Sequence, residues 1–86
     1  MGVGLCYEGE RTLLVFDCVS YGKLEISIGD LLQLKSALNR LSKRINVPIS
    51  KINHVLYNYE VLDINRTIKD LKLKNGAVIL VKFKSE

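Results

Sequence analysis

Hydrophobic and polar residues alternate along the first third of the chain in a pattern that predicts two consecutive strands. Residues 12–19 are rich in β-branched and aromatic types with a two-residue period. A tight turn follows over residues 20–23, where Gly22 supplies a positive φ, and residues 24–28 alternate again. The two strands therefore form a hairpin. Its inward side chains are expected to be Leu14, Phe16, Cys18, Leu24, Ile26 and Ile28.

The hydrophobic period changes from two to about 3.6 after Gly29, which predicts a helix. Asp30, followed three residues later by Gln33, resembles a capping box at the helix start. Pro48 disfavours helical geometry in the residue before it and so ends the helix, after about four turns. The apolar stripe is Leu31, Leu34, Leu38, Leu41 and Ile45.

The rest of the chain predicts further strands at residues 54–57, 60–61 and 77–83, with a turn at Asn75-Gly76 before the last. An Asp70-Leu71 pair is expected to open a one-turn helix. A hairpin, one long helix and further strands can bury the helix stripe only against one face of a mixed sheet. The predicted fold class is α+β, a β-grasp with a four- to five-stranded mixed sheet and parallel first and last strands.

Length and composition indicate one domain. The 86 residues are 48% hydrophobic, enough for a single modest core but not for a deep substrate cavity. Residues 1–11 contain three glycines and no clean period, so we expect a flexible lead-in or an expression remnant there. Residues 12–84 are expected to form the domain.

Few residues suggest catalysis, and none suggests a membrane segment. Cys6 and Cys18 are too few for a disulfide framework or a zinc site, and His54 has no Cys or Ser placed to act with it. No apolar run approaches the roughly 20 residues that span a bilayer, and no signal-peptide pattern begins the chain. We expect no enzyme activity, cofactor or metal, no membrane contact, and a cytoplasmic or nuclear location.

The net charge of +4 is concentrated near the C-terminus, where the last 21 residues carry six basic and two acidic side chains. These six cations, Arg66, Lys69, Lys72, Lys74, Lys82 and Lys84, form either a basic face or a solvated rim. Nucleic-acid binding is not expected, because Phe83 is the only aromatic residue available for stacking among them.

Local sequences in this framework resemble ubiquitin and its relatives over about residues 12–84. They are Tyr21-Gly22-Lys23, Ile45-Asn46-Val47-Pro48, Arg66-Thr67-Ile68-Lys69-Asp70-Leu71 and Val78-Ile79-Leu80-Val81. The resemblance implies a ubiquitin-like fold and a role in protein recognition. It also implies a non-conjugated type, because Lys82-Phe83-Lys84-Ser85-Glu86 holds no di-glycine and chain-forming lysine positions carry Glu60 and Asn75.

The resemblance further implies a shallow apolar patch on the sheet face away from the helix. Lys82 stands where the family usually has an aliphatic residue, Leu80 where it often has histidine, and Tyr59 where it has a turn glycine. Leu13 and Val15 are expected to adjoin the patch. The residues expected to bind a protein partner are Val19, His54, Leu56, Tyr59, Leu80 and Lys82.

The leading hypothesis is a monomeric, non-conjugated ubiquitin-like interaction domain. Its partners would be proteasome or ubiquitin-pathway receptors, or a domain of its own parent protein. The alternative is a Ras-association-type β-grasp adaptor that pairs an edge strand with a GTPase or another acidic partner. The late position of the basic residues weighs against this alternative.

Overall fold

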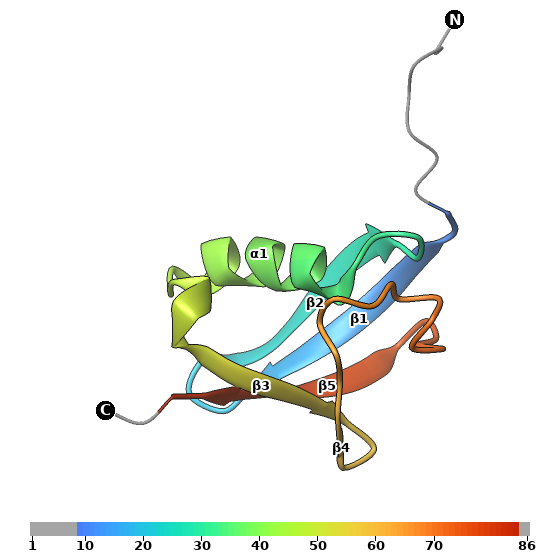
Figure 1. Ribbon diagram of the computed structural model, residues 1–86. Helices are drawn as coiled ribbons and strands as arrows, with labels where there is room; N and C mark the ends of the chain where they lie inside the picture. Colours follow the sequence, from blue (N-terminus) through green and yellow to red (C-terminus); the bar gives the residue numbers. More distant parts are fainter. Residues whose placement is uncertain (1–8, 85–86) are drawn as a thin grey trace, which may run out of the picture.

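The computed structural model describes residues 9–84, which form a five-stranded mixed sheet with one α-helix across one face (Figure 1). The elements are β1 (Arg11–Cys18), β2 (Gly22–Gly29), α1 (Leu34–Ile45), the 3₁₀ turn η1 (Ile49–Lys51), β3 (Ile52–Tyr57), β4 (Glu60–Val61) and β5 (Ala77–Phe83). The predicted α+β class is confirmed. Most of the expected lead-in, residues 1–8, lies outside the described residues, and β1 begins at Arg11, one residue before the expected domain start.

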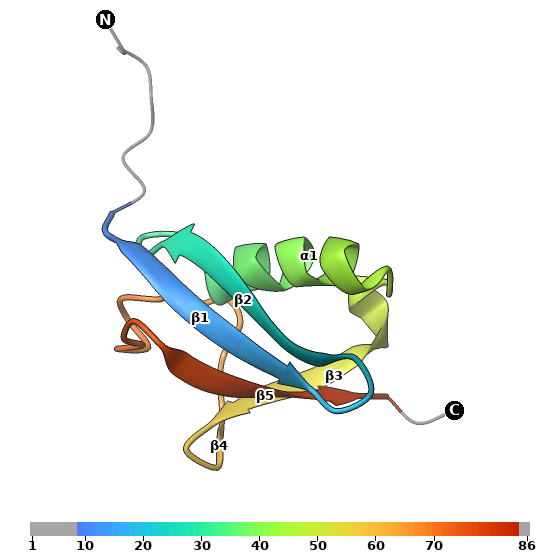
Figure 2. The same ribbon diagram turned by 180° about the vertical axis from the view of Figure 1, so that it is seen from behind.

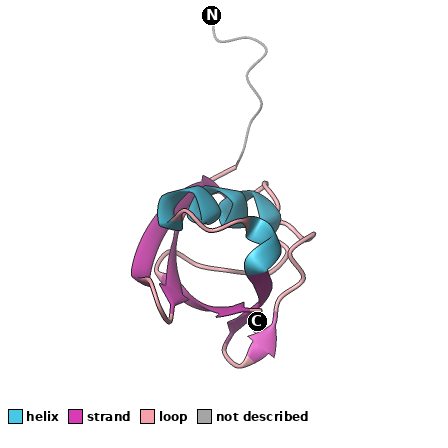
Figure 3. Ribbon diagram, turned by 90° about the vertical axis from the view of Figure 1, so that its left-hand side faces the viewer, coloured by secondary structure: helices cyan, strands magenta, loops and turns pink. Residues whose placement is uncertain are grey.

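The last strand in the sequence occupies the middle of the sheet. The strand order is β2-β1-β5-β3-β4, so β5 lies between β1 and β3, as Figure 2 shows from behind. β1 and β5 are parallel, and the other neighbouring pairs are antiparallel. A parallel pair requires a long crossover, which here carries α1 over the sheet. The end-on view in Figure 3 shows the curved sheet with α1 on one side and the other side open.

Buried side chains from the strands and from α1 form one core. Leu14, Phe16, Cys18, Ile26 and Ile28 are almost fully buried, and Leu24 packs against them, so the six predicted inward positions are confirmed. Each large buried side chain contributes about 1.5–3 kcal/mol relative to exposure. Because strand side chains alternate, this burial also decides which residues face away from the helix.

The predicted start of the helix is wrong by three residues. α1 begins at Leu34, and Leu31 lies in the preceding turn with 41% of its surface exposed. Asp30 makes no capping box, because its Oδ1 accepts a hydrogen bond from the Glu10 backbone N at 3.0 Å. The helix is capped instead from a distant loop, where backbone oxygens of residues 64 and 66 accept from the first two helical N–H groups at 2.9 Å.

The segment before β5 forms turns where a one-turn helix was expected. The backbone N of Leu71 donates to the Thr67 O at 3.1 Å, but no helix is assigned to residues 62–76. The Thr67 Oγ1 accepts from the Asp70 backbone N at 3.0 Å, so Thr67 caps this turn locally. The structure also confirms a turn at Asn75-Gly76, where Gly76 has a φ of 84°. This turn is joined to β1, because Asn75 Oδ1 accepts from the Leu13 N at 2.6 Å.

Candidate protein-binding face of the sheet

The sheet face opposite α1 carries a group of aliphatic side chains. Val55, Ile79 and Val81 are completely buried under the helix, so their strand neighbours point the other way. Cross-strand pairing then brings the outward residues together: Leu56 pairs with Leu80 and with Val61, and Val15 pairs with Val78. We call the surface formed by Val15, Leu56, Val61, Val78 and Leu80 the open face.

The open face is hollowed at one place. A shallow hollow of about 230 Å³ is lined by Leu56, Asn58, Tyr59, Val78 and Leu80. Its walls come from β3, from the β3–β4 turn and from β5, so three segments must be assembled before it exists. Its lining is mostly apolar, and it has room for one apolar side chain of a partner.

Tyr59 stands at the rim of this hollow and is 99% exposed. It follows Asn58 in the two-residue turn between β3 and β4, and both residues have a positive φ, 53° for Asn58 and 68° for Tyr59. Two consecutive left-handed residues are typical of a type I′ hairpin turn, whose second position favours glycine. The chain therefore holds a large aromatic ring in solvent at a position with unfavourable backbone geometry.

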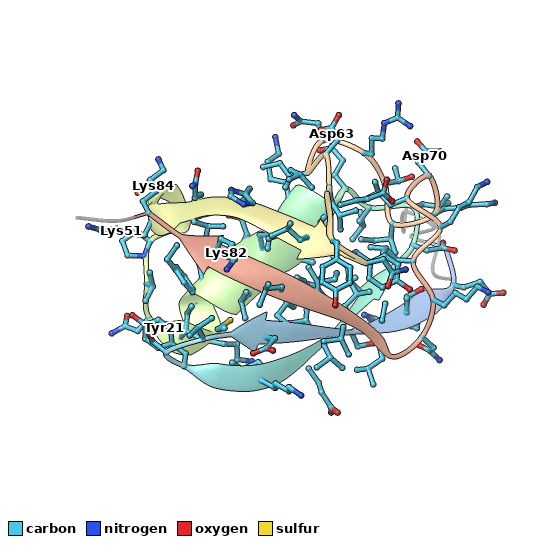
Figure 4. All side chains as sticks on the ribbon, turned by 90° about the horizontal axis from the view of Figure 1, so that it is seen from below. Tyr21, Lys51, Asp63, Asp70, Lys82 and Lys84 are labelled. Carbon is cyan, nitrogen blue, oxygen red and sulfur yellow. The ribbon has the colours of Figure 1, made fainter. Side chains whose placement is uncertain are left out.

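Basic residues lie beside the hollow along the same strands. His54 pairs with Lys82 across β3 and β5, two residues from Leu56 and Leu80 respectively. His54 is half-buried and Lys82 is exposed. Figure 4, which views the molecule from below, shows Lys82 well inside this side of the sheet. The hollow itself is thus mostly apolar, and the Lys82 cation lies just beyond one end of it.

The structure brings together five of the six residues that the sequence selected. Leu56, Tyr59 and Leu80 line the hollow, and His54 and Lys82 adjoin it. Val19 is 72% exposed but lies in the β1–β2 turn, one residue beyond the Cys18–Val81 pair, and does not line the hollow. It belongs to the margin of the open face.

Sequence reasoning missed Val78 and Val61 as part of this surface, whereas alternation placed Asn58 on the same side as Leu56. Val78 is 49% exposed and Val61 is 63% exposed. The alternation of β5 places Val78 on the same side as Leu80, so that signal was present in the sequence. Val61 could not be found in this way, because its position depends on the register between β3 and β4.

The C-terminal basic residues do not form one face. Arg66, Lys69, Lys72 and Lys74 precede β5, whereas Lys82 and Lys84 lie near its far end. A strand of this length separates the two groups by roughly 20 Å. Figure 4 shows Lys84 at one end of the molecule and Asp70 at the other. Asp70 lies between Lys69 and Lys72 in the sequence, so it marks the position of the first group.

The described residues offer little reactive chemistry. No group of three or more His, Cys, Asp or Glu side chains within residues 9–84 could hold a metal ion. Cys18 is fully buried, and burial, with a smaller contribution from the charge of Asp17, raises the pKa of its thiol above the usual 9.0. This thiol stays protonated near neutral pH and acts as a small apolar core residue.

Within the described part of the chain, no helix is long and apolar enough to cross a membrane.

Comparison with known proteins shows a likeness of structure but not of sequence. No protein-family model and no curated protein matches the chain. A protein designed de novo on the basis of ubiquitin superposes with a TM-score of 0.77 at 16% identity, over 88% of this chain and 92% of its own. The ubiquitin of Caldiarchaeum subterraneum gives a TM-score of 0.78 at 11% identity, over 90% of this chain and 98% of its own.

A third solved structure, reported as molecular mimicry of SUMO that promotes DNA repair, has a TM-score of 0.77 at 18% identity. The match covers 85% of this chain and 91% of that one. At identities this low the similarity is one of fold. The described residues form a ubiquitin-like β-grasp domain, as the sequence resemblance implied.

Proposed function

We propose that this chain is a non-conjugated ubiquitin-like interaction domain that docks a protein partner on its open face. The observation that carries the proposal is the hollow between Leu56, Val78 and Leu80, with Tyr59 at its rim. Isolated exposed aliphatic residues are ordinary, but a contiguous apolar group on one sheet face is typical of a binding surface. Its partners would be proteasome or ubiquitin-pathway receptors, or another domain of the parent protein.

The form of the open face favours an amphipathic helix or a small domain as the partner. One apolar anchor fills the hollow, and neighbouring apolar side chains cover Val61 and Val15, as in helix-in-groove recognition. Tyr59 supplies an exposed aromatic ring of the kind enriched at binding hot spots. Lys82 adds an attraction for an acidic residue at one end of the partner segment.

A heteronuclear titration of the labelled chain with a ubiquitin-interacting helix and with a proteasome receptor tests the proposal. We expect chemical-shift changes at Leu56, Val78 and Leu80. Val78→Ser should weaken binding roughly tenfold, because it removes about 1.5 kcal/mol of apolar burial. Leu31→Ser is the matched control, since Leu31 is exposed to a similar degree in the turn before α1. Shifts confined to other surfaces would reject the open face as the docking site.

The edge-strand alternative is a second candidate, because folding places basic residues next to β2. Arg40, Lys43 and Arg44 of α1 line a hollow of about 420 Å³ together with Ile26 and Ser27 of β2. α1 carries four cations and no acidic residue, so the wall beside this edge is strongly basic. The sequence interpretation missed this cluster, because it considered only the late basic residues.

The edge of β2 is only partly available for strand pairing. β2 pairs with β1 alone, and its other edge faces outward. However, the Arg40 Nη1 donates to the Ser27 backbone O at 3.0 Å, so an incoming strand would have to displace this contact. Binding by this route to an acidic GTPase surface should fall steeply with salt and with Arg44→Glu, and should be unaffected by Leu56→Ser.

A further inference from the structure

The hollow of about 420 Å³ between α1 and β2 is built mainly from cations. Arg40, Lys43 and Arg44 line it together with Ile26 and Ser27, and we call it the basic hollow. The three cations share one face of α1, because helix residues three and four positions apart are neighbours. No Asp or Glu is among the lining residues. The basic hollow shares no lining residue with the hollow of the open face.

A fourth cation approaches this hollow from the sheet. The Ser27 backbone O accepts from the Arg40 Nη1 at 3.0 Å and from the Arg11 Nη1 at 3.4 Å. Arg40 belongs to α1 and Arg11 to β1, so two guanidinium groups from different elements converge on one neutral oxygen. Two positive charges this close repel each other, and a carbonyl group carries no net charge that offsets them. An anion beside both guanidinium groups would relieve the repulsion.

Other interactions account for only part of this cluster. Lys43 and Arg44 lie in the last turn of α1, where cations interact favourably with the helix dipole. Glu25 of β2 lines an adjoining hollow with Arg44 and offsets part of the Arg44 charge. Neither interaction explains Arg40, which precedes the last turn, or Arg11 of β1. The convergence of these two arginines is therefore the feature that indicates a ligand.

We propose that the basic hollow binds a compact polyphosphate, with two linked phosphate groups as in pyrophosphate or a soluble diphosphate ester. A phosphate group has three acceptor oxygens and can contact donors from several directions, whereas a carboxylate offers two oxygens in one plane. The guanidinium fork also matches phosphate oxygens in pairs. One phosphate group lies against Arg40 and Lys43, and the other lies beside Arg11.

The hydrogen bonds of the two arginines disfavour an extended peptide as the occupant. A strand that pairs with the edge of β2 would have to displace Arg40 and Arg11 from the Ser27 O. A compact anion leaves both hydrogen bonds in place, because each guanidinium group has five N–H donors. The volume of about 420 Å³ also lies within the range of roughly 300–1,000 Å³ that small-ligand sites occupy.

Pyrophosphate titrated into the labelled 86-residue chain, in magnesium-free buffer at physiological salt, tests the proposal. Citrate and sulfate are the control anions. We expect pyrophosphate to shift the amide signals of Ser27, Arg40 and Lys43, and both controls to bind at least about fivefold more weakly. Equal binding of citrate and pyrophosphate would overturn the proposal, because the hollow would then attract any polyvalent anion.

Variants distinguish a specific site from a general attraction to positive charge. Arg40→Gln should weaken pyrophosphate binding roughly tenfold, and Arg40→Lys, which keeps the charge but loses the fork, roughly threefold. Lys72→Gln is the matched control for charge, because Lys72 is exposed in the loop before β5, and it should change binding by less than about twofold. Equal losses in Arg40→Gln and Lys72→Gln would show that only net charge matters and would refute the site.

Lipid headgroups and nucleic acids carry phosphate groups of the same chemistry. Phosphatidylcholine vesicles that contain phosphatidylinositol 4,5-bisphosphate, and a single-stranded oligonucleotide, are therefore titrated alongside pyrophosphate. We expect neither to bind more tightly than pyrophosphate at equal phosphate concentration. Tighter binding of either one would contradict a small soluble ligand.

Leu56→Ser separates this site from the proposed docking face. It should leave pyrophosphate binding unchanged while weakening the partner that occupies the open face. Loss of pyrophosphate binding in Leu56→Ser would contradict the assignment to the basic hollow. Failure of the open-face titration alone would leave it intact.

Discussion

At the scale of single residues, Tyr59 combines a structural cost with a candidate binding role. Its φ of 68° lies in the left-handed region, and its side chain is 99% exposed. A left-handed non-glycine residue costs roughly 1–2 kcal/mol, and strain of this kind is often retained where it serves function. The fold gains no burial from the Tyr59 ring, which is exposed for the partner contact proposed above.

Tyr59→Gly is therefore expected to stabilise the fold and to weaken partner binding. Relief of the left-handed strain outweighs the roughly 0.5–1 kcal/mol of extra backbone entropy that glycine adds to the unfolded chain. The free energy of unfolding in urea should rise by about 0.5 kcal/mol. Tyr21→Gly is the control and should lower it, since Tyr21 has no positive φ and contacts Phe83. A Tyr59→Gly chain that is clearly less stable would contradict the strain argument.

Cys18 gives a pH dependence whose sign follows from its environment. Burial, then the charge of Asp17, raises the pKa of the thiol in the folded chain above its ordinary 9.0. The folded state thus holds the proton more tightly than the unfolded state does. The corresponding stability is present below pH 9 and is lost as the pH rises through the folded pKa. When urea unfolding is measured between pH 7 and pH 10.5, the free energy of unfolding should fall more steeply for the native chain than for Cys18→Ala. Parallel plots of this free energy against pH would contradict the assignment to Cys18.

At the scale of elements, the strands were predictable from the sequence and the start of the helix was not. Alternation identified the inward residues of β1 and β2, and the predicted bounds of β4 and β5 are also correct. β3 begins at Ile52, two residues before its predicted start. The helix start failed because its first N–H groups bond to the distant loop at residues 64 and 66. A local capping pattern cannot reveal a partner that lies some 30 residues away in the sequence.

Asp30→Ala distinguishes the two interpretations of the helix start. If Asp30 formed a capping box, its loss would make the Gln33 amide exchange faster with solvent. The structure predicts instead that the Glu10 amide loses protection, because the Asp30 Oδ1 accepts its hydrogen bond at 3.0 Å. The stability loss should be about 1 kcal/mol. Native-state hydrogen exchange measures both amides, and faster exchange confined to Gln33 would restore the capping box.

At the scale of the whole molecule, the surface hollows depend on assembly more than on local sequence. Leu56 and Leu80 were predictable as outward residues, but the pairing of Leu56 with Leu80 and with Val61 required the sheet order. A hollow at the end of the sheet is lined by residues 20–21, 46–48, 51 and 83–84, and no sequence pattern connects these segments. By contrast, the six basic residues near the C-terminus are close in sequence, but the length of β5 separates the four that precede it from Lys82 and Lys84.

The position of β5 makes folding of the whole chain depend on its last strand. β1 and β3 pair with β5 and not with each other, so a chain that ends at Gly76 would leave two separate strand pairs. Two-stranded sheets are marginal in water, and Ile79 and Val81 would be missing from the core. We expect the chain of residues 1–76 to show the narrow amide dispersion of an unfolded protein.

The control for this truncation is Val61→Glu, which alters the short edge strand β4 instead. Val61 is 63% exposed and β4 pairs only with β3, so the variant should remain folded with at most about 1 kcal/mol lost. Addition of a peptide of residues 77–86 to the truncated chain should restore dispersed amide signals, because it supplies the central strand. A folded 1–76 chain would show that the β1–β2 hairpin and α1 are stable without β5, and would contradict the dependence derived from the sheet order.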